Sequence, residues 1–166
     1  DHAGGNENMG KVGATIFAHD NVRVRLAAGG TTIGNVTPPA PAVALPVVTY
    51  SHGLTFHLNG EDIDAVFTGG GHTDGDTVVY WRKANVVHMG DLMMQGMGFP
   101  FIDTESGGNA VHLVVTLDKV LARAARRAGQ EYRTSQPARQ PPALLRRPQV
   151  LSQCIFGSSA EGDFAP

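Results

Sequence analysis

Four strand-forming segments follow one another between residues 54 and 88, and this run constrains the fold more than any other feature of the sequence. The segments are residues 54–58, 63–68, 77–81 and 85–88. Asn59 and Gly60 join the first two and favour a tight β-turn. The last two are continuously apolar, which is typical of a sheet covered on both faces. The sequence therefore predicts a central sheet built from consecutive hairpins.

Helical patterns flank this sheet on both sides. Residues 13–19 predict a short buried strand, after which Asp20 is placed to cap a helix that ends at Gly29. Residues 109–128 carry apolar side chains at helical spacing, and Gly129 predicts the end of that helix. Strands combined with flanking helices indicate a layered α/β domain.

Two further patterns predict which face of a strand is buried and where the chain is irregular. In the segment 63–68 the residues Ile63, Ala65 and Phe67 alternate with Asp62, Asp64 and Val66, which predicts one buried face. Residues 30–46 contain four prolines and predict a long irregular connection.

Composition excludes several classes of protein. The chain has 166 residues, of which 42% are hydrophobic, as expected for one globular domain. It has no apolar run long enough to span a bilayer, so no membrane partner is expected. Cys154 is its only cysteine. Thiolate metal clusters are therefore excluded, and histidine and carboxylate side chains must hold any bound metal.

Charge divides the chain into two parts. Twelve acidic and 5 basic residues lie at or before Asp118, whereas 3 acidic and 8 basic residues follow it. Residues 130–166 are rich in Pro, Arg, Gln and Ser without a sustained period. We therefore predict a domain over residues 1–129 and a disordered, low-order tail over 130–166. The tail lacks interleaved aromatic residues, so no nucleic-acid partner is expected.

Reactive side chains follow two of the predicted strands. His72, Asp74 and Asp76 follow one strand within the glycine-rich stretch "GGGHTDGDTVVYW", and Asp91 follows another in "VVHMGDL". A single sheet can bring these loops to one edge. Imidazole and carboxylate groups together are ligands for zinc and other divalent first-row metals. The edge is thus a candidate metal site.

Each of these residues also has a structural explanation. Asp74 is best explained as a turn former, and Asp76 either forms the turn or orients a metal ligand. A single histidine such as His72 more often satisfies a structural hydrogen bond than binds a metal. The remaining histidines, of which His19 is the least settled, fit packing or hydrogen-bonding roles. The spacing of these residues alone does not decide between a metal site and these structural roles.

The residues of four sequence motifs favour the metal site. "DHAGGNE", "HTDGDTVVYW", "VVHMGDL" and "GFPFIDTESGG", taken in this order, resemble the metallo-β-lactamase superfamily of hydrolases from Asp1 to about Ala128. The resemblance implies an αβ/βα sandwich, present here in part, with the active site in a groove at one edge. An α/β fold of this type agrees with the pattern of strands and helices.

The resemblance also implies roles for particular residues. Asp1 and His2 match the last two residues of the family motif HxHxDH and would bind a second metal. His72 matches a ligand of the first metal, and Asp91 matches the acid that bridges both metals and helps to orient the nucleophile. The implied cofactor is zinc, as two ions in an intact relative, with manganese or iron as alternatives.

The ligand set is incomplete by the family pattern. The two leading histidines of HxHxDH would precede Asp1, and no histidine follows His112 to supply the family's late ligand. In this chain the first metal would have only His72 and Asp91 as ligands, whereas the second would have Asp1, His2 and Asp91. Catalytic zinc normally needs three protein ligands and a water. The sequence therefore predicts a fragment with weak or no activity.

The expected function is metal-dependent hydrolysis of a small-molecule ester, thioester, lactone or β-lactam through a metal-bound water. One alternative is a non-catalytic remnant with at most a binding role. A more remote one is a metal-free sugar- or peptide-binding domain. The apolar side chains after Asp91 form either a substrate wall or part of the core. These side chains are Met93, Met94, Met97, Phe99 and Phe101.

Overall fold

The computed structural model describes residues 2–32, 34–94, 96, 98–134 and 149–151. Along the chain, its elements are α1 (Asn6–Lys11), β1 (Phe17–His19), α2 (Asp20–Ala28), β2 (Gly30–Thr32), β3 (Asn35–Thr37), the 3₁₀ turn η1 (Ala42–Ala44), β4 (Val48–Tyr50), β5 (Gly53–Leu58), β6 (Glu61–Phe67), β7 (Thr77–Trp81), β8 (Val86–His88), the 3₁₀ turn η2 (Gly90–Leu92), α3 (Ala110–Thr134) and β9 (Gln149–Leu151).

A five-stranded sheet with the order β5-β6-β7-β8-β9 forms the centre of the molecule. Strands β5 to β8 pair antiparallel as consecutive hairpins, as the sequence predicts, and β9 pairs parallel to β8. Asn59 and Gly60 adopt φ angles of 53° and 71° in the first hairpin turn. Both residue types tolerate this left-handed conformation, so the turn fixes the register of β5 on β6.

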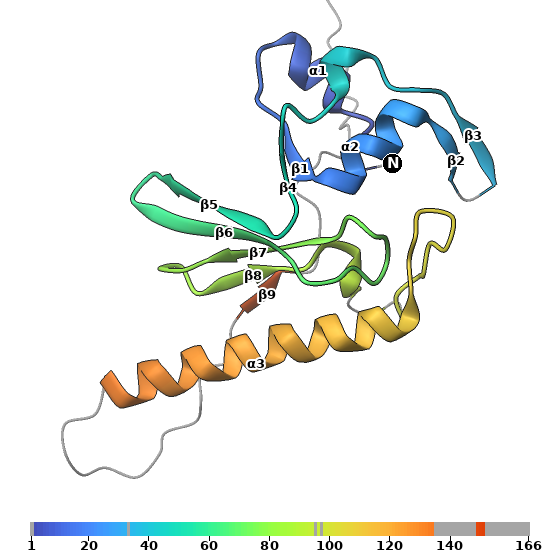
Figure 1. Ribbon diagram of the computed structural model, residues 1–166. Helices are drawn as coiled ribbons and strands as arrows, with labels where there is room; N and C mark the ends of the chain where they lie inside the picture. Colours follow the sequence, from blue (N-terminus) through green and yellow to red (C-terminus); the bar gives the residue numbers. More distant parts are fainter. Residues whose placement is uncertain (1, 33, 95, 97, 135–148, 152–166) are drawn as a thin grey trace, which may run out of the picture.

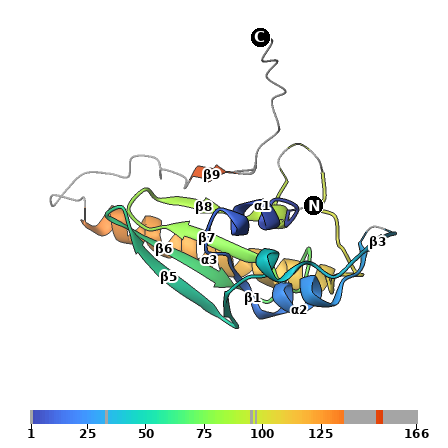
Figure 2. The same ribbon diagram turned by 90° about the horizontal axis from the view of Figure 1, so that it is seen from above.

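Helix α3 covers one face of the sheet, and α2 with β1 and β4 lies on the other side near one end (Figures 1 and 2). The core lies under α3, where the apolar residues of β7, β8, η2 and α3 pack together. These residues are Val78, Tyr80, Val87, Met89, Leu92, Leu113 and Val120. Two small sheets, β1 with β4 and β2 with β3, complete the described structure. None of the described helices is long and apolar enough to cross a membrane.

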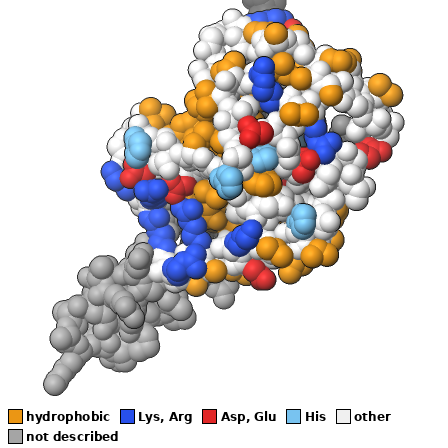
Figure 3. Space-filling model, viewed as in Figure 1, with side chains coloured by type: hydrophobic (Ala, Val, Ile, Leu, Met, Phe, Trp, Pro, Cys, Tyr) orange, Lys and Arg blue, Asp and Glu red, His pale blue; other side chains and the backbone are white. Residues whose placement is uncertain are grey.

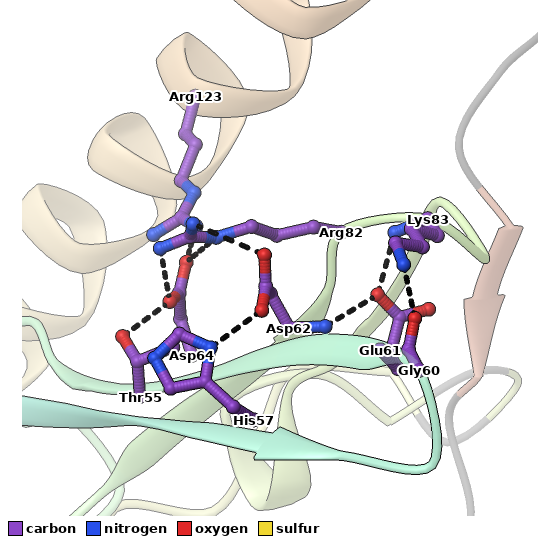
Figure 4. A network of polar contacts seen from close by, with 9 residues as sticks. All are labelled: Thr55, His57, Gly60, Glu61, Asp62, Asp64, Arg82, Lys83 and Arg123. Carbon is purple, nitrogen blue, oxygen red and sulfur yellow. Dashed lines mark hydrogen bonds and ion pairs between the residues drawn. The ribbon is translucent and has the colours of Figure 1, made fainter.

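Asp64 on β6 connects the sheet to α3 (Figure 4). Its carboxylate accepts hydrogen bonds from Arg82 at 3.0 and 2.7 Å, from Thr55 at 2.8 Å and from Arg123 of α3. The Arg123 guanidinium also lies 3.7 Å from the centre of the Tyr80 ring. Burial would raise the pKa of Asp64, but these donors outweigh it and lower the pKa to about 2. Asp64 is buried, although the alternation with Ile63, Ala65 and Phe67 predicts that these three residues form the buried face.

Three other sequence predictions need correction. The side chain of His19, rather than Asp20, caps α2, since its Nδ1 accepts from the Asn21 backbone N–H. The segment predicted as an irregular connection contains the β2–β3 hairpin. Gly129 does not end α3, which continues to Thr134. An interior glycine costs a helix about 1 kcal/mol, which neighbouring helical residues can offset.

The predicted domain boundary at residue 129 lies inside α3. Of the predicted tail, the backbone is described for residues 130–134 and for β9. Residues 135–148 and 152–166 lie outside the described residues.

Candidate active site

The loops after β6 and β8 lie at the same end of the sheet. Both strands pair antiparallel with β7, so they run in the same direction and their C-terminal ends meet. His72 lies in the loop between β6 and β7, and Asp91 lies in η2 directly after β8. His2 precedes α1 and reaches the same place from the start of the chain. On the face shown in Figure 3, histidine side chains gather beside acidic and hydrophobic ones.

Asp91 is the meeting point of two histidines. Its Oδ2 lies 2.8 Å from Nε2 of His2 and 3.4 Å from Nε2 of His72. The side chains of Asp91 and His72 are 20% and 17% exposed, whereas that of His2 is 62% exposed. Three of the four predicted metal ligands therefore lie together, with the two histidines facing one oxygen of Asp91. The fourth, Asp1, lies outside the described residues.

The ring of His72 has a defined orientation. Its Nδ1 lies 2.7 Å from the carbonyl oxygen of Phe101. Since a carbonyl can only accept, Nδ1 carries a proton and donates it to this bond. In the neutral ring, Nε2 is then left as an acceptor that faces the Asp91 carboxylate. Either a bound cation or a proton on Nε2 would make this contact between imidazole and carboxylate favourable. Metal-binding histidines typically have their other ring nitrogen held by such a carbonyl.

Asp76 belongs to the loop that carries His72. Its carboxylate accepts from the Thr73 backbone N–H at 3.2 and 3.1 Å and from the Thr73 hydroxyl at 2.8 Å. Burial raises the pKa of Asp76, although these donors and the nearby His72 act in the opposite direction. Asp76 thus shapes the loop on which His72 lies.

Asp74 has a partner that the sequence did not reveal. Its two carboxylate oxygens accept from Nε and Nη2 of Arg25 in α2, at 2.9 and 2.6 Å. Asp74 was predicted as a turn former, and it does lie in the turn after His72. The ion pair joins residues that are 49 positions apart, and no local pattern indicates such a pair.

The other histidines have contacts elsewhere. His19 stacks on Phe67 with ring centroids 4.0 Å apart, and His57 pairs with Asp62 at 2.6 Å. His88 accepts from the Gly90 backbone N–H at 3.2 Å. The interpretation of these residues as packed or hydrogen-bonded fits the geometry.

The side chains near Asp91 are of the types that bind divalent metals, but their arrangement falls short of a complete site. Ligands at about 2.0 to 2.2 Å from a tetrahedral zinc lie about 3.3 to 3.6 Å from each other, and the His72–Asp91 distance of 3.4 Å agrees with this. The His2–Asp91 distance of 2.8 Å is that of a hydrogen bond. Within the described part of the chain, no group of three or more His, Cys, Asp or Glu side chains is arranged to hold a metal ion.

Comparison with known families identifies the fold. The family model described as "Metallo-beta-lactamase superfamily" matches residues 1–143. The chain belongs to this superfamily. A metallo-beta-lactamase from Pontibacter korlensis is similar in structure, with a TM-score of 0.59 and 20% identity over 77% of this chain and 54% of its own. A metallo-beta-lactamase family protein from Thermus thermophilus has a TM-score of 0.50 and 20% identity over 76% and 48%. No curated protein matches the sequence.

Membership confirms the predicted family and the α/β fold of the metallo-β-lactamase type. This is the fold of metal-dependent hydrolases, and members of the superfamily typically bind metal ions, commonly zinc. The chain spans about half the length of the two solved structures.

Proposed function

We propose that this chain carries part of the active site of a metal-dependent hydrolase, with His2, His72 and Asp91 as metal ligands and Asp1 as a fourth. The convergence of His2 and His72 on one oxygen of Asp91 supports the proposal. These residues come from three separate segments of the chain. Metal binding gives a chemical reason for imidazole and carboxylate groups to meet at this point.

Each side chain has a definite task in this proposal. His72 presents Nε2 because the Phe101 carbonyl holds Nδ1, so the ring needs little reorganisation to bind a cation. Oδ2 of Asp91 lies near imidazole nitrogens of both His2 and His72, which supports a role for this carboxylate as a metal ligand that would also orient a water molecule. When bound, the metal supplies Lewis acidity, which activates water and polarises a substrate carbonyl. The expected substrates are an ester, thioester, lactone or β-lactam.

Apolar side chains beside the site favour a substrate with a hydrophobic group. The Phe101 ring centroid lies 6.0 Å from that of His72, and the side chains of Phe99 and Phe101 are 70% and 50% exposed. Leu92 in contrast is fully buried and belongs to the core. Phe101 is therefore available to contact a substrate, whereas Leu92 is not.

Hydrolysis and zinc content measured together test the proposal. The zinc-treated protein is assayed against a chromogenic ester, a thioester, a lactone and a β-lactam, beside the variants His72→Ala and His57→Ala. His57 is exposed and pairs with Asp62, so it serves as a matched control. We expect His72→Ala to lose hydrolysis and bound zinc, and His57→Ala to keep both.

Zinc affinity is expected to be weaker than sub-micromolar, because no group of three or more described side chains is arranged to hold a metal ion. Equal hydrolysis and zinc content in His72→Ala and the unmodified protein would contradict the proposal. That result would favour the alternative, a non-catalytic domain with at most a binding role.

A further inference from the structure

Helix α2 lies directly against the loop that carries His72. Asn21 donates from its side-chain amide to the Asp74 carbonyl at 2.9 Å, and Arg25 binds the Asp74 carboxylate. Gly75 lies so close to the helix that an added Cβ would be 2.4 Å from Cγ2 of Val22. Asn21, Val22 and Arg25 share one face of α2, because residues three and four apart are neighbours on a helix. This face therefore fixes the position of residues 73–75.

Arg25 connects α2 to two loops at once. Its Nε and Nη2 donate to Asp74 as a two-bond fork, and its Nη1 lies 3.3 Å from the carbonyl oxygen of Glu105. Planar two-bond recognition of a carboxylate defines orientation as well as distance. The guanidinium thus joins the loop after β6 to the loop before α3.

The two loops are also hydrogen-bonded to each other around His72. Asp74 donates its backbone N–H to the Ser106 carbonyl at 3.1 Å, and Asp103 donates its own to the His72 carbonyl at 2.9 Å. The His72 ring in turn donates to the Phe101 carbonyl. The backbone and the ring of His72 are therefore both held by the loop before α3.

Little space is left for this loop to shift. An added Cβ at Gly107 would lie 2.7 Å from Asp74 Oδ2 and 2.8 Å from Arg25 Nη2. At Gly108 it would lie 2.1 Å from the His72 carbonyl oxygen. Two glycines thus let the loop approach both the Arg25–Asp74 pair and His72. Backbone contacts thus connect the Arg25–Asp74 pair to His72.

We propose that Arg25 is a positioning residue, which through Asp74 and Glu105 holds the Phe101 carbonyl where it fixes the His72 ring with Nε2 toward Asp91. The effect on the orientation of the His72 ring does not depend on metal binding and can be measured in the metal-free protein. Its consequence for metal binding rests on the function proposed above.

The test measures the ring state of His72 separately from metal binding. Nitrogen-15 NMR of the metal-free protein reports which imidazole nitrogen of His72 carries the proton. Calorimetric titration reports zinc affinity. The first variant is Arg25→Met, which removes both hydrogen bonds to the Asp74 carboxylate. The second is Arg25→Lys, which keeps the positive charge and can make one of these hydrogen bonds. Asp74→Asn removes the charge from the other partner.

Arg82→Met is the matched control, because Arg82 makes the same two-bond fork with Asp64 at the other end of β7. We expect Arg25→Met and Asp74→Asn to populate the second His72 tautomer and to weaken zinc binding about tenfold, as is typical when a group orienting a ligand is lost. Arg25→Lys should lie between Arg25→Met and the unmodified protein. Arg82→Met should lower stability and leave the His72 signals unchanged.

Unchanged His72 signals in Arg25→Met would overturn the inference. So would equal changes in Arg25→Met and Arg82→Met, because the effect would then be a general loss of stability. If the tautomer shifts in Arg25→Met while the unmodified protein binds no zinc, the positioning role is supported and the proposed function alone fails.

Discussion

Replacing Asp64 by Asn removes the negative charge at the centre of the network between β5, β6 and α3 (Figure 4). The substitution keeps the shape of the side chain and leaves two guanidiniums, those of Arg82 and Arg123, without their shared counter-charge. Asn at this position still accepts a hydrogen bond from Thr55 or one arginine. The loss is therefore chiefly electrostatic.

The magnitude follows from the pKa of the carboxyl group. A lowering from 3.8 to about 2 corresponds to about 2 kcal/mol of stability at neutral pH. The partners Arg82 and Arg123 are 45% and 34% exposed, so solvent screening argues against a larger value. For a chain of this size, about 2 kcal/mol lowers the melting temperature by about 4 to 8 °C.

The dependence on pH separates this loss from a change in packing. Since the pKa of Asp64 is lower in the folded state, its contribution is fully present above the unfolded value of 3.8. It is lost as the pH falls through about 2. The stability difference between the unmodified protein and Asp64→Asn should therefore be complete at pH 7 and clearly smaller at pH 3.

Urea unfolding followed by the fluorescence of Trp81, the single tryptophan, measures this difference at each pH. Asp62→Asn is the control, because Asp62 is a more exposed carboxylate on the same strand and should change stability little. The reasoning is refuted if Asp64→Asn matches the unmodified protein at pH 7. It is also refuted if the difference between the two stays constant from pH 7 to pH 3.

Three further substitutions test local features of the fold and the site. Thr116→Val removes a fully buried hydroxyl that donates to a carbonyl at 2.7 Å, and it should cost about 1 to 3 kcal/mol in urea unfolding. Asn109→Ala removes the side chain that accepts from two backbone N–H groups at the start of α3, and it should cost about 1 kcal/mol by the same assay. Gly108→Ala places a Cβ against the His72 carbonyl and should weaken zinc binding in calorimetry, whereas Gly5→Ala, with nothing within 4 Å, should not.

The central hairpins were predictable because their determinants are local. Asn59 and Gly60 supply the turn between β5 and β6, and Asn85, with a φ of 56°, contributes to the turn before β8. Such turn residues specify a hairpin without knowledge of the rest of the chain. The end of α3 was missed for the opposite reason, since Gly129 alone does not outweigh the helical residues on both sides.

The long-range ion pairs were not predictable from the local pattern. Asp64 alternates with apolar residues and therefore resembles a residue on a solvent-exposed face. Its burial depends on Arg123, which lies 59 positions later on a different element. The Arg25–Asp74 pair likewise joins distant segments. Long-range pairs of this kind depend on how helices are placed on the sheet.

The geometry of the candidate site was predictable only in part. The ends of β6 and β8 had to meet because both strands pair with β7, so the approach of His72 to Asp91 follows from strand order. The contact of His2 with Asp91 does not follow from strand order, and only the resemblance to the family pointed to it. The metal-binding role of all three residues stays a prediction.

A crystal structure of zinc-soaked protein, with anomalous diffraction recorded on both sides of the zinc absorption edge, tests that role most directly. We expect an anomalous peak in contact with Nε2 of His72 and with the Asp91 carboxylate, and no such peak in His72→Ala. An anomalous peak elsewhere, such as at His57 and Asp62, or none at Asp91, would contradict the assignment of a metal site.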